Sequence, residues 1–142
     1  MTLTAQVLAG LMALTLIVVG ALETFFFRSA ALYPIFLIEP GEYDAVALWT
    51  RNVGVYNMLM GIATVIGIAL VRRGQVAAGR ALVLAFGGMH VVLGLTLLLT
   101  APELWLSALS ESGLALAVVV AVLAGDRRAD RERHRTDASR AT

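Results

Sequence analysis

Four long runs of apolar residues constrain this chain more than any other feature. They cover about residues 3–27, 48–71, 77–99 and 102–124, and each contains few charged side chains. A helix needs about 20 such residues to cross the hydrocarbon core of a bilayer. Hydrophobic residues make up 59% of the chain and charged residues only 15%, far from the balance of soluble domains. We therefore predict an all-α fold: a four-helix antiparallel transmembrane bundle.

The connections between the runs predict how the helices are arranged. The connections after residues 71 and 99 are so short that the helices they join must be adjacent and antiparallel. The long connection, residues 28–47, contains an apolar segment, residues 30–38, which is too short to span and should lie at the interface or cap the bundle. We predict one transmembrane domain, residues 1–125, and a charged cytoplasmic tail, residues 126–142, which should be disordered.

The positions of the arginines predict the orientation. Arg72, Arg73 and Arg80 flank the second connection and six more arginines follow the fourth run, whereas the first connection is net acidic. The positive-inside rule then places both termini in the cytoplasm. Trp49 and Trp105 begin the second and fourth runs, where an outer aromatic belt would lie. We predict a multi-pass protein of the inner (plasma) membrane with both termini inside.

A few polar side chains interrupt the apolar runs. Glu23 lies near the outer end of the first run, and Arg51, Asn52, Tyr56 and Asn57 open the second. Antiparallel packing brings both groups to the same depth, and hydrocarbon offers no water to satisfy them. We predict that Glu23 meets the Asn/Tyr cluster across a seam between two helices.

Two further ionisable residues lie deeper. A rise of about 1.5 Å per residue puts His90 of the third run and Glu111 of the fourth near the midplane or in the outer half. The inner halves of the first, second and fourth runs, residues 4–14, 63–71 and 117–124, are almost wholly apolar. We predict a polar pocket that opens outward over an apolar floor. Its candidate residues are Glu23, Arg51, Asn52, Tyr56, Asn57, His90 and Glu111.

Small residues support inward faces for these groups. Gly54 and Gly61 lie on either side of Asn57, and another pair of glycines brackets His90. Small residues at such spacing let membrane helices approach closely. We therefore expect Asn57 and His90 to face neighbouring helices.

Two interpretations of the ionisable residues stay open. Glu23 is either a proton or cation site, or an interfacial carboxylate paired with Arg51 or hydrogen-bonded to Asn52 and Tyr56. His90 and Glu111 either relay a proton or hold a ligand, or they only join two helices. The aromatic run 25–27 is interpreted as a lipid-facing interface anchor.

Several classes of site and partner are not expected. There is no cysteine and only one histidine lies within the runs, so we predict no metal site and no cofactor. A net charge of +1 gives no reason to expect nucleic acid. No catalytic motif is present, so no residue is assigned a catalytic role. The expected partners are membrane lipid and either a second copy of the chain or a larger membrane complex.

The sequence resembles a known family. The resemblance rests on Leu8-Ala-Gly-Leu-Met-Ala-Leu14, Glu23 followed by aromatics, Phe36, and Asn52-x-Gly-x-Tyr-Asn57. Small bacterial four-helix integral membrane proteins catalogued as a domain of unknown function, DUF1304, have a similar pattern.

The chain departs from the family pattern at two places. Val53 stands where the family usually has glutamine, and a Glu-His pair expected before Glu23 is replaced by Thr15-Leu16. The resemblance implies the four-helix fold and the membrane location. It implies no activity.

Three functions are compatible with these residues. The pocket could bind a small or lipid-like ligand, or the bundle could dock on a membrane partner. Alternatively, the chain could be a proton-coupled small-molecule transporter that acts as a dimer and uses Glu23. The third candidate is a small membrane enzyme using His90 and Glu111 as an acid–base pair on an apolar substrate.

Overall fold

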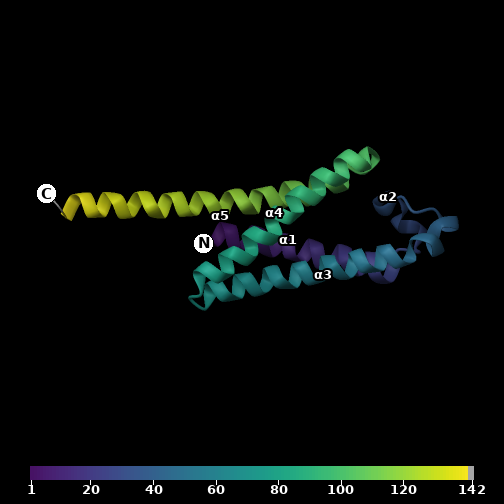
Figure 1. Ribbon diagram of the computed structural model, residues 1–142, viewed down its shortest axis with the longest axis horizontal. Coiled ribbons are helices and arrows are strands. Elements are labelled where there is room, and N and C mark those ends of the chain that lie inside the picture. The colour runs from purple at the N-terminus through teal and green to yellow at the C-terminus, as the bar shows by residue number, and fades with distance from the viewer. Residues whose placement is uncertain (141–142) are drawn as a thin grey trace.

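Helices account for nearly all of the described chain. The computed structural model describes the backbone of residues 1–140 and the side chains through Gly125. The long helices are α1 (Leu3–Ala21), α3 (Tyr43–Arg72), α4 (Val76–Thr100) and α5 (Trp105–Arg140), and residues 1–140 contain no strand (Figure 1). A π-helical turn, Leu22–Phe26, continues α1.

The helical segments match the predicted spans. Those long and apolar enough to cross a membrane are Leu3–Phe26, Pro40–Arg72, Val76–Thr100 and Pro102–Gly125. Large apolar side chains are exposed on every one of them, and Leu99 reaches 74% exposure. Water would penalise such a surface, whereas acyl chains match it. The predicted all-α, four-span, multi-pass fold is confirmed.

Consecutive long helices run in opposite directions. The α3–α4 turn and the N-terminus lie toward one end of the bundle, and α2 (Tyr33–Phe36) and the α4–α5 connection lie toward the other (Figure 1). At the α3–α4 turn, Gly74 has a φ of 86°, and its N–H donates to the carbonyl of Val71 while that of Gln75 donates to Leu70. This Schellman motif ends α3 within a four-residue reversal.

The first connection is folded rather than extended. It contains a 3₁₀ turn (Ala30–Leu32), α2, and a second 3₁₀ turn (Pro40–Glu42) that is closed by a capping box between Glu39 and Glu42. A hydrogen bond to Glu39, reinforced by the charges of Glu39 and Glu42, raises the pKa of the Tyr33 hydroxyl. These bonds hold an apolar segment over one end of the bundle.

Glycines form the seams between neighbouring helices. A Cβ on Gly54 would lie 2.6 Å from the carbonyl oxygen of Gly20, so α1 and α3 touch through their backbones. On α4, a Cβ on Gly79 would lie 2.8 Å from the amide nitrogen of Val71 on α3, and one on Gly94 would lie 2.9 Å from that of Ser112 on α5. The close approach of these helices therefore depends on the absence of a side chain at each of these glycines.

The apolar core occupies the half of the bundle that contains the N-terminus. Its buried members come from α1, α4 and α5: Ala5, Ala9, Met12, Leu16, Val83, Ala115, Val118 and Val122. The predicted apolar floor is thus present as a packed cluster. The other half contains Glu23, Asn57 and Glu111.

The last helix continues beyond the predicted end of the bundle. The sequence predicted disorder from residue 126, but the backbone of α5 is helical to Arg140. Arginine, alanine and glutamate have high helix propensities, so a helix that leaves the bundle can propagate through this segment. The division into a bundle and a separate tail stays a prediction, and the tail side chains lie outside the described part of the chain.

Candidate functional site

The turn that carries Glu23 is a π-helix. It covers Leu22–Phe26, directly after the α-helical part of the first span. Within it, the Thr24 hydroxyl donates a 2.7 Å hydrogen bond to the carbonyl of Gly20. This bond lies where the backbone hydrogen bonds change from the α-helical to the π-helical pattern. Single π-helical turns are frequent at functional sites. The sequence predicted an unbroken α-helix here and gave no sign of the wider turn.

Asn57 is the partner of Glu23. Its Nδ2 donates a 2.7 Å hydrogen bond to Glu23 Oε2 across the α1–α3 seam, and the residue is only 9% exposed. Gly54 and Gly61 lie on the same buried face of α3. The predicted contact between Glu23 and the Asn52–Asn57 turn is therefore present.

The other polar residues of this turn face away. Asn52 is exposed, and its Nδ2 donates to the carbonyl of Leu48 in its own helix. Tyr56 is also exposed, and the Arg51 guanidinium lies 5.8 Å from the ring centroid of Phe27. Pairing of Glu23 with Arg51, or with Asn52 and Tyr56, is therefore wrong in this structure. The glycine seam turns only one stripe of α3 inward, and that stripe contains Asn57.

The aromatic run after Glu23 divides in the same way. Phe25 and Phe26 are exposed, as an interface anchor requires. Phe27 is buried and packs edge-on against Tyr43, with ring centroids 6.1 Å apart. The prediction of a lipid-facing anchor is therefore wrong for Phe27, because the chain reverses here and packs this ring against α3.

His90 and Glu111 approach each other across the α4–α5 seam. The imidazole is fully buried, and its Nε2 lies 3.8 Å from Glu111 Oε1. The other ring nitrogen, Nδ1, lies 2.9 Å from the carbonyl oxygen of Phe86. Among the described residues, Nε2 has no hydrogen-bond partner. The distance of 3.8 Å between Nε2 and Oε1 is within the range of an ion pair but too long for a hydrogen bond.

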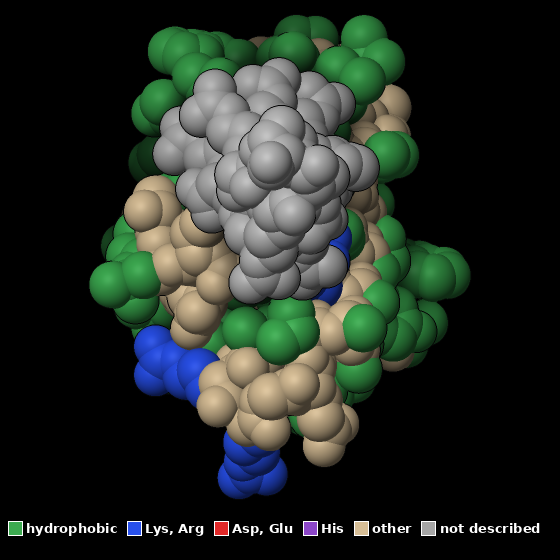
Figure 2. All heavy atoms as spheres, turned by 90° about the vertical axis from the view of Figure 1, so that its left-hand side faces the viewer, with side chains coloured by type: hydrophobic (Ala, Val, Ile, Leu, Met, Phe, Trp, Pro, Cys, Tyr) green, Lys and Arg blue, Asp and Glu red, His purple; other side chains and the backbone are tan. Residues whose placement is uncertain are grey.

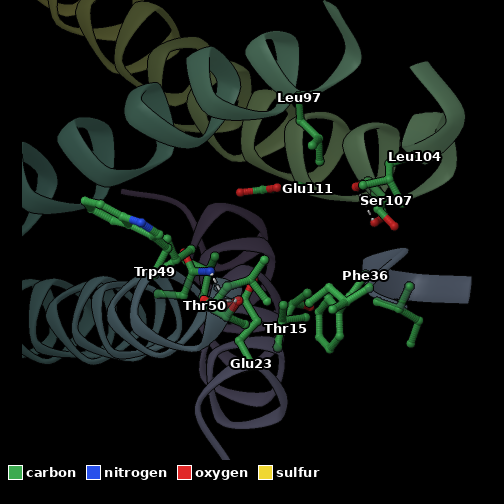
Figure 3. Close-up of a pocket in the computed structure, with 17 residues that line it drawn as sticks. Thr15, Glu23, Phe36, Trp49, Thr50, Leu97, Leu104, Ser107 and Glu111 are labelled. Atoms are coloured by element: carbon green, nitrogen blue, oxygen red, sulfur yellow. Dashed lines mark hydrogen bonds between the residues drawn. The ribbon is translucent and has the colours of Figure 1, made fainter. Parts of the chain in front are cut away.

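A cavity of about 490 Å³ is lined by Glu23, Asn57 and Glu111. Glu23 and Thr50 project from one side, and Glu111 and Ser107 lie on the opposite side (Figure 3). The walls come from α1, α3, α4, α5 and the first connection. The lining consists of Thr15, Leu16, Val19, Glu23, Ile35, Phe36, Ile38, Val46, Trp49, Thr50, Val53, Asn57, Leu97, Leu104, Ser107, Ser110 and Glu111.

The cavity contains only part of the predicted set. Glu23, Asn57 and Glu111 line it, and His90 stands behind Glu111 without lining it. Arg51 and its exposed neighbours Asn52 and Tyr56 do not contribute to the lining.

Sequence reasoning missed several lining residues. Thr50 lies seven residues before Asn57, two helical turns along the same face, so helical periodicity could have found it. Ile35 and Phe36 belong to the segment expected to cap the bundle, but no pattern says which of its side chains turn inward. Among the described residues, no group of three or more His, Cys, Asp or Glu side chains is placed to hold a metal ion.

Comparison with known proteins identifies a family. The family model described as "Protein of unknown function (DUF1304)" matches residues 10–124, which include every cavity-lining residue. No curated protein and no solved structure matches the chain significantly.

Proposed function

The chain belongs to the family of proteins of unknown function DUF1304, and since that description assigns no activity, we propose from the geometry that this membrane protein binds a small amphipathic molecule. The cavity beside Glu23, Asn57 and Glu111 is the binding site. We also place the protein in the inner membrane of a bacterium, with both termini in the cytoplasm and the cavity in the outer half of the bilayer.

One observation carries the binding proposal. The cavity volume of about 490 Å³ falls within the ~300–1,000 Å³ of typical small-molecule sites. Such sites combine mostly apolar walls with a few convergent polar groups. This cavity has that composition, because aliphatic and aromatic side chains surround two carboxyl groups and one carboxamide.

The charge distribution supports the orientation. Arg72 and Arg73 are exposed at the α3–α4 turn, and Arg80 lies one turn into α4. Figure 2 views this end of the bundle and shows basic but no acidic side chains among those it colours. Glu39, Glu42 and Asp44 lie in or beside the connection at the other end. This asymmetry is the one that the positive-inside rule associates with a cytoplasmic α3–α4 turn.

An enzymatic role receives less support from the geometry. His90 would be the general base, but its imidazole is fully buried and does not line the cavity. A bound molecule meets Glu111 first. His90 is better placed to position Glu111 than to attack a substrate.

Binding can be tested with the tryptophan in the cavity wall. Trp49 lines the cavity and Trp105 does not, so a Trp105→Phe protein in phosphatidylcholine nanodiscs has one reporter. We expect a terminally brominated undecanol to quench Trp49 fluorescence saturably. Ser107→Phe, which fills the cavity, should remove the saturable component, and the exposed, non-lining Leu99→Phe should keep it. Identical, non-saturating quenching in all three proteins would overturn the proposal.

A further inference from the structure

The hydrogen-bonding capacity of the cavity is strongly biased toward acceptors. The hydroxyls of Thr15, Thr50 and Ser110 all donate to backbone carbonyls of their own helices, at 3.1, 3.0 and 2.8 Å. These side chains therefore present only oxygen lone pairs to a ligand.

The larger polar groups strengthen this bias. Asn57 already uses one of its N–H donors on Glu23, so that carboxyl group keeps its second oxygen for a ligand. Glu111 adds two more carboxyl oxygens from the opposite wall (Figure 3). The donors left in the lining are the second N–H of Asn57, the Ser107 hydroxyl and the indole N–H of Trp49. No arginine, lysine or histidine belongs to the lining.

A second observation points to the same place. His90 is fully buried behind Glu111, and its Nε2 lacks a hydrogen-bond partner among the described residues. Buried polar atoms are normally satisfied, and an exception calls for a reason. This nitrogen lies 3.8 Å from Glu111 Oε1, so the carboxyl group of Glu111 stands between the unpartnered imidazole nitrogen and the cavity.

We propose that the cavity selects amphipathic primary amines, with the ammonium group between Glu23 and Glu111 and the apolar body against the aliphatic walls. This inference rests on the proposed binding function and names its ligand class. An ammonium group supplies three N–H donors and no acceptor, the complement of the lining. Charge-assisted hydrogen bonds to carboxylates are about twice as strong as neutral ones. The indole of Trp49 adds a ring face that attracts cations.

The test compares three head groups on one body. Brominated undecylamine, undecanol and undecanoic acid have the same chain and the same quencher. Quenching of Trp49 in the Trp105→Phe protein therefore gives binding affinities that can be compared directly. We expect the amine to bind at least about tenfold more tightly than the alcohol, because it replaces neutral hydrogen bonds with charge-assisted ones. The acid should bind most weakly.

Matched variants assign the selectivity to the two carboxyl groups. Glu23→Gln keeps an oxygen that can accept from Asn57, and Glu111→Gln keeps the volume of the wall, so both should fold. Each should reduce the preference for the amine over the alcohol by about tenfold. Glu103→Gln removes an exposed carboxylate outside the lining and should leave the preference unchanged.

The outcomes separate the two proposals. Saturable binding of all three probes with no preference for the amine overturns the ligand class and leaves the binding function standing. No saturable binding of any probe overturns both. If the amine is preferred, nanodiscs containing phosphatidylethanolamine identify the source of the ammonium group: competition indicates an aminophospholipid, and its absence indicates a free amine.

Discussion

Nε2 of His90 lies 3.8 Å from Oε1 of Glu111, while the opposite ring nitrogen is 2.9 Å from the carbonyl oxygen of Phe86. A carbonyl can only accept, so Nδ1 must carry a proton. The neutral ring therefore offers Nε2 as a lone pair directed at Glu111. The backbone of α4 thus determines which tautomer meets the carboxyl group.

This relationship predicts the tautomer of His90. In nitrogen NMR spectra of labelled protein, the neutral ring should show a protonated Nδ1 and an unprotonated Nε2. The Glu111→Gln variant should shift the Nε2 resonance, because a carboxamide N–H can donate to it. A spectrum with the proton on Nε2 would contradict the predicted arrangement. The exposed Glu103→Gln substitution serves as the control and should leave the resonance unchanged.

The bond between Asn57 and Glu23 predicts a difference in stability. Asn57→Ala removes the donor and leaves a half-buried carboxyl group without its partner. We expect a loss of about 1–2 kcal/mol in the free energy of unfolding, measured by denaturant titration in mild detergent. Asn52→Ala breaks only a bond to its own helix at an exposed position and should change stability by less than about 0.5 kcal/mol. Equal effects of the two substitutions would refute the assignment.

The glycine seams predict opposite effects of the same substitution. Gly54→Ala would place a Cβ 2.6 Å from the Gly20 carbonyl oxygen, and Gly94→Ala one 2.9 Å from the Ser112 nitrogen. Each should destabilise the bundle by about 1–3 kcal/mol, because the helices must separate. A Cβ on Gly88 meets nothing within 4 Å.

Gly88→Ala is therefore the matched control for α4. It should be neutral or stabilise the helix by up to about 1 kcal/mol, since alanine has the higher helix propensity. Thermal unfolding in one detergent compares all three variants. A destabilised Gly88→Ala variant together with an unaffected Gly94→Ala variant would show that the seam is placed on the wrong face.

The proposed orientation predicts a labelling pattern. The chain has no cysteine, so single cysteines introduced at exposed positions are labelled without background. In intact cells, an impermeant maleimide should label Glu42→Cys in the first connection. It should label Gln75→Cys at the α3–α4 turn only after the membrane is opened. The reverse pattern would place the cavity in the inner half of the bilayer and overturn the orientation.

Much of the fold could be predicted from the sequence because a bilayer permits so few alternatives. Each span must be a helix of about the same length, and short connections force antiparallel neighbours. The depth of Glu23 and Asn57 followed from that arrangement alone. The π-helical turn did not, because it depends on how the end of α1 packs against α3 and not on the local residue types.

The candidate site was only partly predictable. Polarity grouped Arg51, Asn52, Tyr56 and Asn57 together, although an α-helix turns these residues toward different faces. The positions of Gly54 and Gly61 identify the face of α3 that packs inward, and of these four polar residues only Asn57 lies on that face. The residues of the first connection gave no such signal, since a short irregular segment has no periodicity from which to infer a face.

The contact between Gly20 and Gly54 also limits how the cavity can change shape. Backbone meets backbone at this crossing, immediately beside the turn that carries Glu23. Neither α1 nor α3 can slide past the other there without collision, so this crossing fixes the position of the two helices relative to each other. Any widening of the cavity must therefore come from α4 and α5 or from the folded segment between α1 and α3.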